Sequence, residues 1–151
     1  MAEQSLKEFF RKKKAKAGGD IDWAARKDEW VQTIRDLYKT ITDDYLAEPV
    51  ADGSVAVAED EKTIVEEFIG PYQAPELVLQ VGDEKVVFSP KGRNIVGASG
   101  RIDLVGEMGV KTLVVQPERR WGVVESRTPT LRIVPLDKES LLSALKDVMR
   151  P

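Results

Sequence analysis

The sequence predicts an α+β domain: an antiparallel meander of about six strands, packed on one face by a long N-terminal helix and a short C-terminal helix. Helical periodicity covers residues 20–47 and returns only near the C-terminus, whereas the chain between them alternates short β-branched runs with turn residues. The turns are short, and they leave no room for the crossovers that parallel strands require. The strands should therefore pair antiparallel, in the order in which they occur.

Length and composition are those of one ordinary domain. The chain has 151 residues, 42% hydrophobic and 32% charged, which is enough to build a core without disulfides or metals. We expect a basic amphipathic arm over residues 1–19, with its mobility left open, and a single α+β domain over residues 20–151. No run approaches the roughly 20 apolar residues of a membrane span, and no signal-peptide core is present, so we expect a cytoplasmic protein.

Residues 3–17 are predicted to form a short amphipathic helix. Ser5 and Glu8 have the spacing of a capping box, and three apolar residues recur on one face at helical intervals. The opposite face is basic, and Gly18-Gly19 ends the segment with permissive backbone. The apolar residues are Leu6, Phe9 and Phe10, and the cations are Lys7, Arg11, Lys12, Lys13, Lys14 and Lys16.

A long helix is predicted to run from Asp20 or Asp22, both suitable N-caps, to about Ala47. No glycine or proline interrupts this stretch, and its apolar residues recur at the helical period. Pro49 follows the expected end, where a helix would not comfortably continue. Trp23 and Trp30 belong to this stripe, and we interpret them as core residues rather than as a stacking platform for a ligand.

The middle of the chain is predicted to be strand. Gly82-Asp83 separates two β-branched runs and has the sequence of a type II′ hairpin turn, and a second turn is expected over Gly106-Glu107-Met108-Gly109. The Glu66-Glu67 pair leaves a helix open as the alternative over residues 55–69. The candidate strands cover residues 55–58, 63–69, 77–81, 85–89, 100–105, 111–116, 121–126 and 131–136, with a further start at Ile95-Val96.

The last predicted element is a helix that begins after Asp137. Asp137 is a suitable N-cap, and Leu136 and Leu141 have the spacing of a hydrophobic staple around it. The apolar faces of this helix and of the long helix then have one place to pack, which is the same face of the sheet.

The near-neutral total charge conceals a strong asymmetry along the chain. The net charge is −3, but residues 49–84 hold nine acidic side chains and only Lys62, a net −8, whereas residues 85–151 carry a net +5. We interpret this as acidic and basic strands lying side by side, with their exposed faces offsetting each other.

The composition excludes several classes of site. The chain has no histidine and no cysteine, so Ser-His and Cys-His relays, disulfides and thiolate or imidazole zinc sites are ruled out. The glycine-rich stretch over residues 90–109 has neither the Walker spacing nor the dinucleotide-binding fingerprint, and no carboxylate group has EF-hand spacing. We therefore expect no metal, no cofactor and no catalytic residue of these kinds, and we interpret the glycines as turns and bulges.

Arg101 and Asp103 form the first candidate site. They lie two residues apart, so on a strand both side chains project from the same face while Ile102 and Leu104 enter the core. Arg101 could then bind a carboxylate or phosphate on a partner, with Asp103 fixing its rotamer. The alternative is an ion pair at the surface with no ligand.

Three further candidates lie around the next hairpin. Arg119, Arg120 and Trp121 form a basic tip followed by an aromatic residue, a combination found at protein interfaces and nucleic-acid platforms. The alternative is that Trp121 is a core or rim residue beside a charged turn.

Arg132 is a further candidate. It is out of phase with Leu131 and Ile133, so its side chain could lie on the face that carries Arg101.

These observations favour a small non-catalytic protein-interaction or regulatory module that binds another protein or a second copy of itself. One alternative is nucleic-acid binding through the basic arm, with Arg11, Lys12, Lys13, Lys14 and Lys16 contacting phosphates, although the acidity of the chain argues against it. A further alternative is a histidine-independent enzyme that uses Arg101, Asp103, Glu125 and Arg132 on a small anionic substrate.

Overall fold

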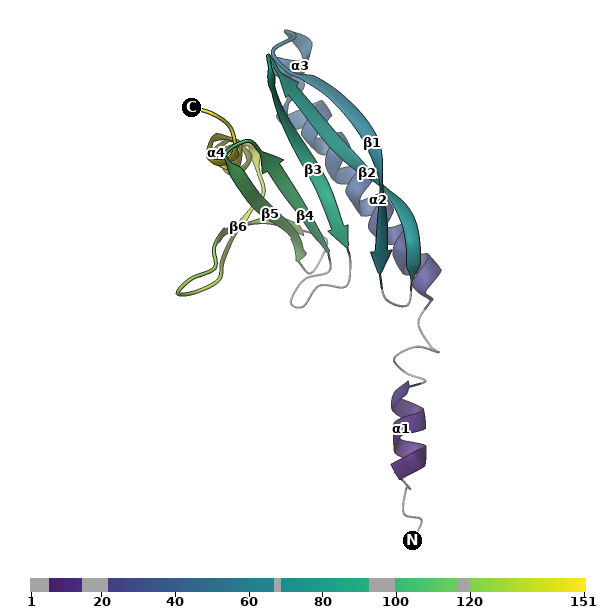
Figure 1. The fold of residues 1–151 in the computed structure, drawn as a ribbon. Helices are drawn as coiled ribbons and strands as arrows, with labels where there is room; N and C mark the ends of the chain where they lie inside the picture. The colour runs from purple at the N-terminus through teal and green to yellow at the C-terminus, as the bar shows by residue number, and fades with distance from the viewer. Residues whose placement is uncertain (1–5, 15–21, 67–68, 93–99, 117–119) are drawn as a thin grey trace.

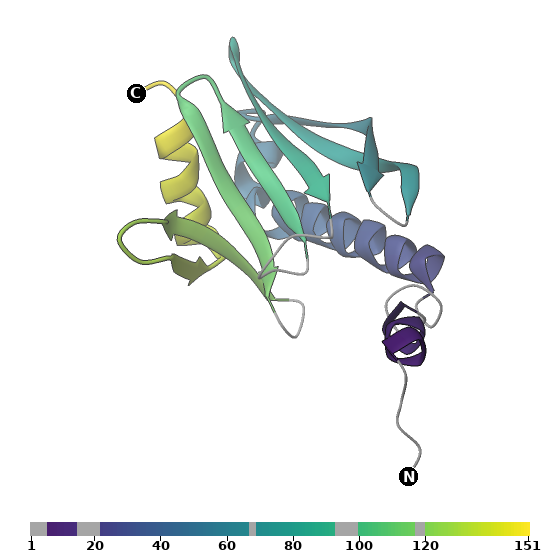
Figure 2. The same ribbon diagram turned by 60° about the horizontal axis from the view of Figure 1, so that its bottom comes forward.

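The fold is a seven-stranded antiparallel sheet with helices on one face, as seen in the computed structural model (Figures 1 and 2). The model describes residues 6–14, 22–66, 69–92, 100–116 and 120–151. Each strand pairs with the next along the chain, so the sheet is a pure meander. The strands are β1 (Ala56–Glu66), β2 (Gly70–Val81), β3 (Glu84–Gly92), β4 (Arg101–Gly106), β5 (Gly109–Gln116), β6 (Arg120–Ser126) and β7 (Arg132–Pro135).

The two large helices pack on the same face, as the sequence predicts. Buried residues of both helices belong to one hydrophobic cluster with the inward side chains of the strands, and Figure 2 shows both helices behind the sheet. We call this side the inner face and the opposite side the outer face. The helices are α1 (Leu6–Lys14), α2 (Trp23–Thr40), the π-helical η2 (Ile41–Tyr45), α3 (Ala47–Ala51) and α4 (Lys138–Val148).

The sheet has more strand than the sequence indicates. β1 and β2 form one long hairpin, and β1 continues through the three acidic residues 59–61 and Lys62, where no strand was expected. The helical alternative for residues 55–69 is therefore wrong over residues 56–66. β2 also contains Pro71 and Pro75, which lie where β2 pairs with β1 alone. The Pro75 carbonyl accepts a hydrogen bond from Tyr38, so the polar groups of this residue point away from β1 and its missing N–H costs the ladder nothing.

The helix ends match the capping signals except at Pro49. The Asp22 side chain accepts a hydrogen bond from Ala25 N at 3.0 Å, and Asp137 forms a reciprocal capping box with Ser140. Pro49 was expected to follow the end of the helical region, but it lies inside α3. It occupies the first turn of this short helix, where no intrahelical hydrogen bond requires its N–H.

The predicted turns are present. β2 and β3 are joined through Gly82-Asp83, with Gly82 at φ +62°, and Gly106 pairs with Gly109 across the next tight turn. The expected strand start at Ile95-Val96 lies outside the described residues. Within the described part of the chain, no helix is both long enough and apolar enough to cross a membrane.

Two aromatic residues of α2 fix it against the sheet. The Tyr38 hydroxyl is within 2.9 Å of the Pro75 carbonyl and 3.2 Å of the Phe88 carbonyl, so it bridges β2 and β3. Trp30 is 3% exposed, as its predicted core position requires, and lies over Gly100 just before β4. A Cβ atom on Gly100 would lie 2.4 Å from the Trp30 ring, so only glycine fits under the indole.

We expect Gly100→Ala to lower the free energy of unfolding by about 2 kcal/mol, because the added methyl group overpacks a filled core. The effect is measured by urea denaturation. In a Trp30→Leu background the ring is absent, so the same substitution should cost well under half as much. An equal cost in both backgrounds would show that the Trp30 ring is not the obstacle.

Tyr38 should make stability depend on alkaline pH. Burial, together with the charges of Glu76 and Glu59, raises the pKa of the Tyr38 hydroxyl far above its usual value of 10.0. The unfolded chain therefore ionises at this residue while the folded protein stays neutral, so its contribution is complete below pH 10.0 and falls as pH rises.

For Tyr38→Phe we expect a loss of about 1.5 kcal/mol at neutral pH, because the one buried O–H donor shared by the Pro75 and Phe88 carbonyls is removed. Above about pH 10 the variant should lose stability less steeply than the parent protein, since the buried phenol is gone. Urea denaturation at several alkaline pH values measures both effects. Parallel curves for the two proteins would contradict the assignment.

Candidate functional site

Three polar side chains lie in register across the middle of the outer face. Ser89 of β3 pairs with Asp103 of β4, and Asp103 pairs with Thr112 of β5. They lie on the outer face because the neighbours Phe88, Ile102 and Leu113 enter the inner core, and side chains alternate along a strand. All three are more than nine-tenths buried although neither α2 nor α4 lies on this side.

Each of these three residues holds one long cation. Lys62 Nζ donates to Ser89 Oγ at 2.9 Å, Arg101 Nε donates to Asp103 Oδ1 at 2.9 Å, and Arg127 Nη2 donates to Thr112 Oγ1 at 3.2 Å. Thr112 Oγ1 also lies 3.3 Å from Asp103 Oδ1, which joins two of the pairs. We call the set Lys62, Ser89, Arg101, Asp103, Thr112 and Arg127 the polar row.

Asp103 sets the orientation of Arg101. The guanidinium approaches both carboxylate oxygens, through Nε at 2.9 Å and Nη2 at 3.2 Å. This two-point contact fixes the plane of the guanidinium as well as its position. A guanidinium has more N–H donors than one carboxylate accepts, so Arg101 keeps donors for water or a ligand while Asp103 holds it.

Lys62 enters the row from the edge of the sheet. The β1–β2 hairpin twists so strongly that the Lys62 amine reaches past β2 to the Pro90 carbonyl of β3 at 3.0 Å. Burial lowers the pKa of Lys62, the nearby Lys91 lowers it further, and the carboxylates of Glu76 and Asp103 act in the opposite direction. The amine is therefore partly stripped of water and lies near one further cation, Lys91, and near the carboxylates of Glu76 and Asp103.

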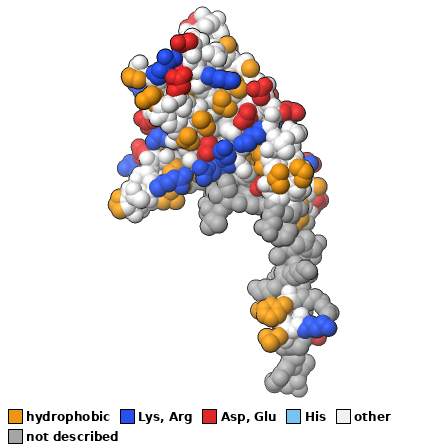
Figure 3. Space-filling model, viewed as in Figure 1, with side chains coloured by type: hydrophobic (Ala, Val, Ile, Leu, Met, Phe, Trp, Pro, Cys, Tyr) orange, Lys and Arg blue, Asp and Glu red, His pale blue; other side chains and the backbone are white. Residues whose placement is uncertain are grey.

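The polar row has three cations and one carboxylate, so its net charge is positive on a face that no helix of the described residues covers. Figure 3 shows this face, with a band of basic side chains running across it below the centre and acidic side chains around it. Guanidinium and ammonium groups held in fixed positions bind carboxylate and phosphate oxygens well. The arrangement is that of an anion-binding surface.

The structure brings some of the predicted residues together and separates others. Arg101 and Asp103 share the outer face and bond to each other, as their spacing predicts. Arg132 does not join them: it pairs with Glu125 at 2.9 Å near the β7 edge, and both side chains are at least half exposed. Within the described residues no hydrogen bond or ion pair links this pair to Arg101 and Asp103, so the four residues proposed for an enzyme form two separate ion pairs.

The candidate residues of the β5–β6 hairpin do not form one site either. Trp121 faces inward, with its ring centroid 6.1 Å from that of Trp30, which agrees with the core or rim interpretation rather than with an exposed anchor. Arg120 is exposed at the start of β6. Arg119 and Lys16 lie outside the described residues. The other arm cations, Arg11, Lys12, Lys13 and Lys14, belong to α1.

Sequence reasoning missed Lys62, Ser89, Thr112 and Arg127. Lys62 offered a usable signal, since it is the one cation among the acidic residues 49–84. Thr112 offered another, because it is a polar residue in alternation with apolar ones on its strand. Arg127 offered none, since its role depends on a contact with a strand fifteen residues earlier in the chain.

Comparison of the chain with family models, with curated proteins and with solved structures finds no match. The described residues also contain no cluster of three or more carboxylates placed to hold a metal ion. The geometry of the polar row is therefore the basis on which a function is proposed.

Proposed function

We propose that this protein is a non-catalytic interaction module whose outer sheet face binds an acidic segment of another protein. The observation that carries the proposal is the register of Ser89, Asp103 and Thr112, each of which holds a cation on the uncovered face. A binding surface with its charges already positioned loses less entropy when a ligand arrives. We expect the protein to act in the cytoplasm.

The charge distribution supports a protein ligand that is acidic rather than basic. The row is positive, whereas exposed carboxylates of β1, including Glu59, Asp60 and Glu61, lie towards one margin of the same sheet. A partner with an acidic segment flanked by neutral or basic residues is attracted to the row and avoids repulsion at that margin. A second copy of the chain could supply the acidic segment from its own β1.

Neutral substitutions in the row test the proposal. We expect Lys62→Gln, Arg101→Gln and Arg127→Gln each to weaken binding of a fluorescein-labelled Glu-rich peptide about fivefold, because each removes one positioned charge contact. Fluorescence anisotropy at low and high salt measures the affinity. Arg132→Gln and Lys146→Gln are matched controls, since they remove the same charge elsewhere. If the row variants and the control variants weaken peptide binding equally, the affinity depends on net charge alone and the proposal is contradicted.

Asp103→Asn separates orientation from charge. This substitution makes the face more positive, so binding by net charge alone would become tighter. If Asp103 positions Arg101, binding becomes weaker instead. Circular dichroism shows whether the variant is folded.

Gel filtration without the peptide shows whether a second copy of the chain occupies the outer face. If it does, the parent protein elutes as a dimer and the row variants elute closer to the monomer.

The second candidate function is nucleic-acid binding through the arm. It is favoured by the exposure of Leu6, Lys7 and Phe10 on α1, which stands apart from the sheet in Figure 1. Cations carried on such a helix can contact successive phosphates. The enzyme alternative stays a prediction, and its four residues lie in two separate ion pairs, Arg101 with Asp103 and Arg132 with Glu125.

For the arm, we expect the triple substitution of Lys12, Lys13 and Lys14 by Gln to reduce the salt dependence of single-stranded DNA binding by about 2 in the log–log slope, because three phosphate contacts are lost. Anisotropy of a labelled oligonucleotide across a salt series gives the slope. If the triple variant has the same affinity and the same salt slope as the parent protein, the hypothesis that the arm binds nucleic acid is contradicted.

A further inference from the structure

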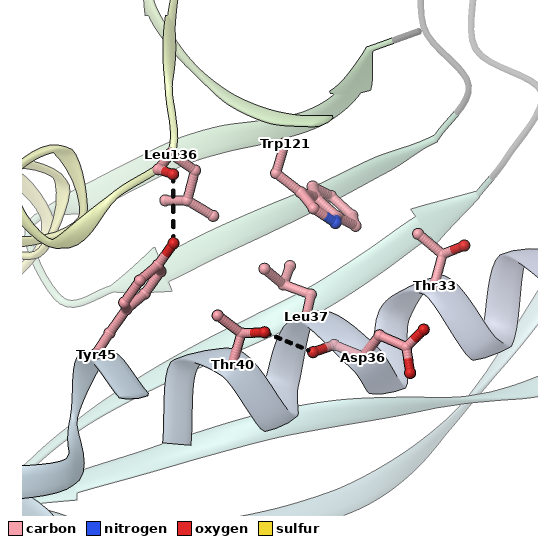
Figure 4. A pocket seen from close by; sticks show the side chains of 7 residues that line it. All are labelled: Thr33, Asp36, Leu37, Thr40, Tyr45, Trp121 and Leu136. Carbon is pink, nitrogen blue, oxygen red and sulfur yellow. Dashed lines mark hydrogen bonds between the residues drawn. The ribbon is translucent and has the colours of Figure 1, made fainter. Parts of the chain in front are cut away.

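A second hollow lies on the inner side of the sheet, away from the polar row. It has a volume of about 270 Å³ and opens beside α2, between that helix, β6 and the segment that leads into α4 (Figure 4). This volume is close to the lower end of the range for small-molecule sites. The hollow is therefore large enough for a compact organic molecule.

One side of the hollow is apolar and aromatic. Trp121 descends from β6 towards Leu37 of α2, and Leu136 lies beside it (Figure 4). Trp121 is supported from behind by the buried ring of Trp30. The π-helical turn η2 adds Tyr45 to the same lining, and π-helical turns are frequent at functional sites. The wall thus offers flat, supported aromatic surface.

The other side of the hollow is polar, and its hydroxyl hydrogens are already committed. Thr33 donates to the Glu29 carbonyl at 2.8 Å, Thr40 to the Asp36 carbonyl at 3.1 Å, and Tyr45 to the Leu136 carbonyl at 3.4 Å. A hydroxyl has one hydrogen, so what these three groups can still offer is lone pairs. Apart from the Trp121 indole N–H, the polar side chains of the lining therefore act as acceptors, and a ligand has to bring donors.

One carboxylate, Asp36, lines the hollow. It receives one hydrogen bond from the Gln32 amide at 2.9 Å, and pairs with no lysine or arginine of the described chain. Burial raises the pKa of Tyr45, and the carboxylates of Asp44 and Asp137 raise it further. A carboxylate with acceptors and an aromatic face beside it is suited to a cation.

We propose that this hollow binds a small organic cation, an ammonium group carried on a flat aromatic body. The ammonium would donate to the Asp36 carboxylate and to the Thr33 or Thr40 oxygen, while the ring would lie against Trp121 and Leu37. The site is separate from the polar row, because the sheet lies between them. It would give the protein a small-molecule ligand that is independent of its protein partner.

Phenethylammonium is the probe, with 2-phenylethanol and phenylacetate as neutral and anionic molecules of similar size and shape. The chain has three tryptophans, so its indole N–H signals in a ¹H–¹⁵N spectrum are few, and Trp121→Phe assigns one of them. We expect phenethylammonium to shift the Trp121 signal in a saturable way. The alcohol and the carboxylate should bind at least about fivefold more weakly.

Asp36→Asn should weaken phenethylammonium binding about fivefold and leave 2-phenylethanol unaffected. Asp28→Asn is the matched control, because Asp28 is an exposed aspartate of the same helix that pairs with Lys27 at 3.4 Å and does not line the hollow. Both variants should leave binding of the acidic peptide to the outer face unchanged. Equal binding of the three probes, an unmoved Trp121 signal, or equal effects of the two Asn substitutions would overturn the proposal.

Discussion

The packing of α2 against one face of the meander is the constraint on which the rest of the structure depends. Strand side chains alternate, so burying one face under a helix assigns every second residue to the core and the others to the opposite side. Phe88, Ile102 and Leu113 belong to the hydrophobic cluster beneath the helices, and this alone places Ser89, Asp103 and Thr112 in one line on the outer face. A slip of one residue in β4 would bury Arg101 under the helix and break the row.

The two faces of the sheet offer opposite chemistry. The outer face gathers donors around a positive row, whereas the hollow beside α2 gathers acceptors around a carboxylate. Most groups of the two sites come from paired strands or from a helix that is pinned by Tyr38 and Trp30, whereas Arg127 directly follows β6 and Leu136 directly follows β7. Rigid elements position binding groups more accurately than loops do, which suits recognition by fixed charges.

The local features were predictable from the sequence, and the long-range contacts were not. The Asp22 and Asp137 caps, the Gly82-Asp83 turn and the meander follow from signals within a few residues, and so does the Arg101–Asp103 pair. The contact of Lys62 with Ser89 spans twenty-seven residues and depends on how far the first hairpin twists. The strand through residues 59–62 was missed because cross-strand pairing overrides the low strand propensity of acidic residues.

The long acidic strand at the margin of the sheet has a consequence for solubility. β1 is an edge strand of eleven residues, and such an edge invites backbone pairing with any other exposed strand. Its exposed run Glu59, Asp60 and Glu61 would face the same run on another copy if two such edges met antiparallel at this point. Repulsion between them opposes edge-to-edge aggregation, so the charge asymmetry of the chain also protects its most vulnerable strand.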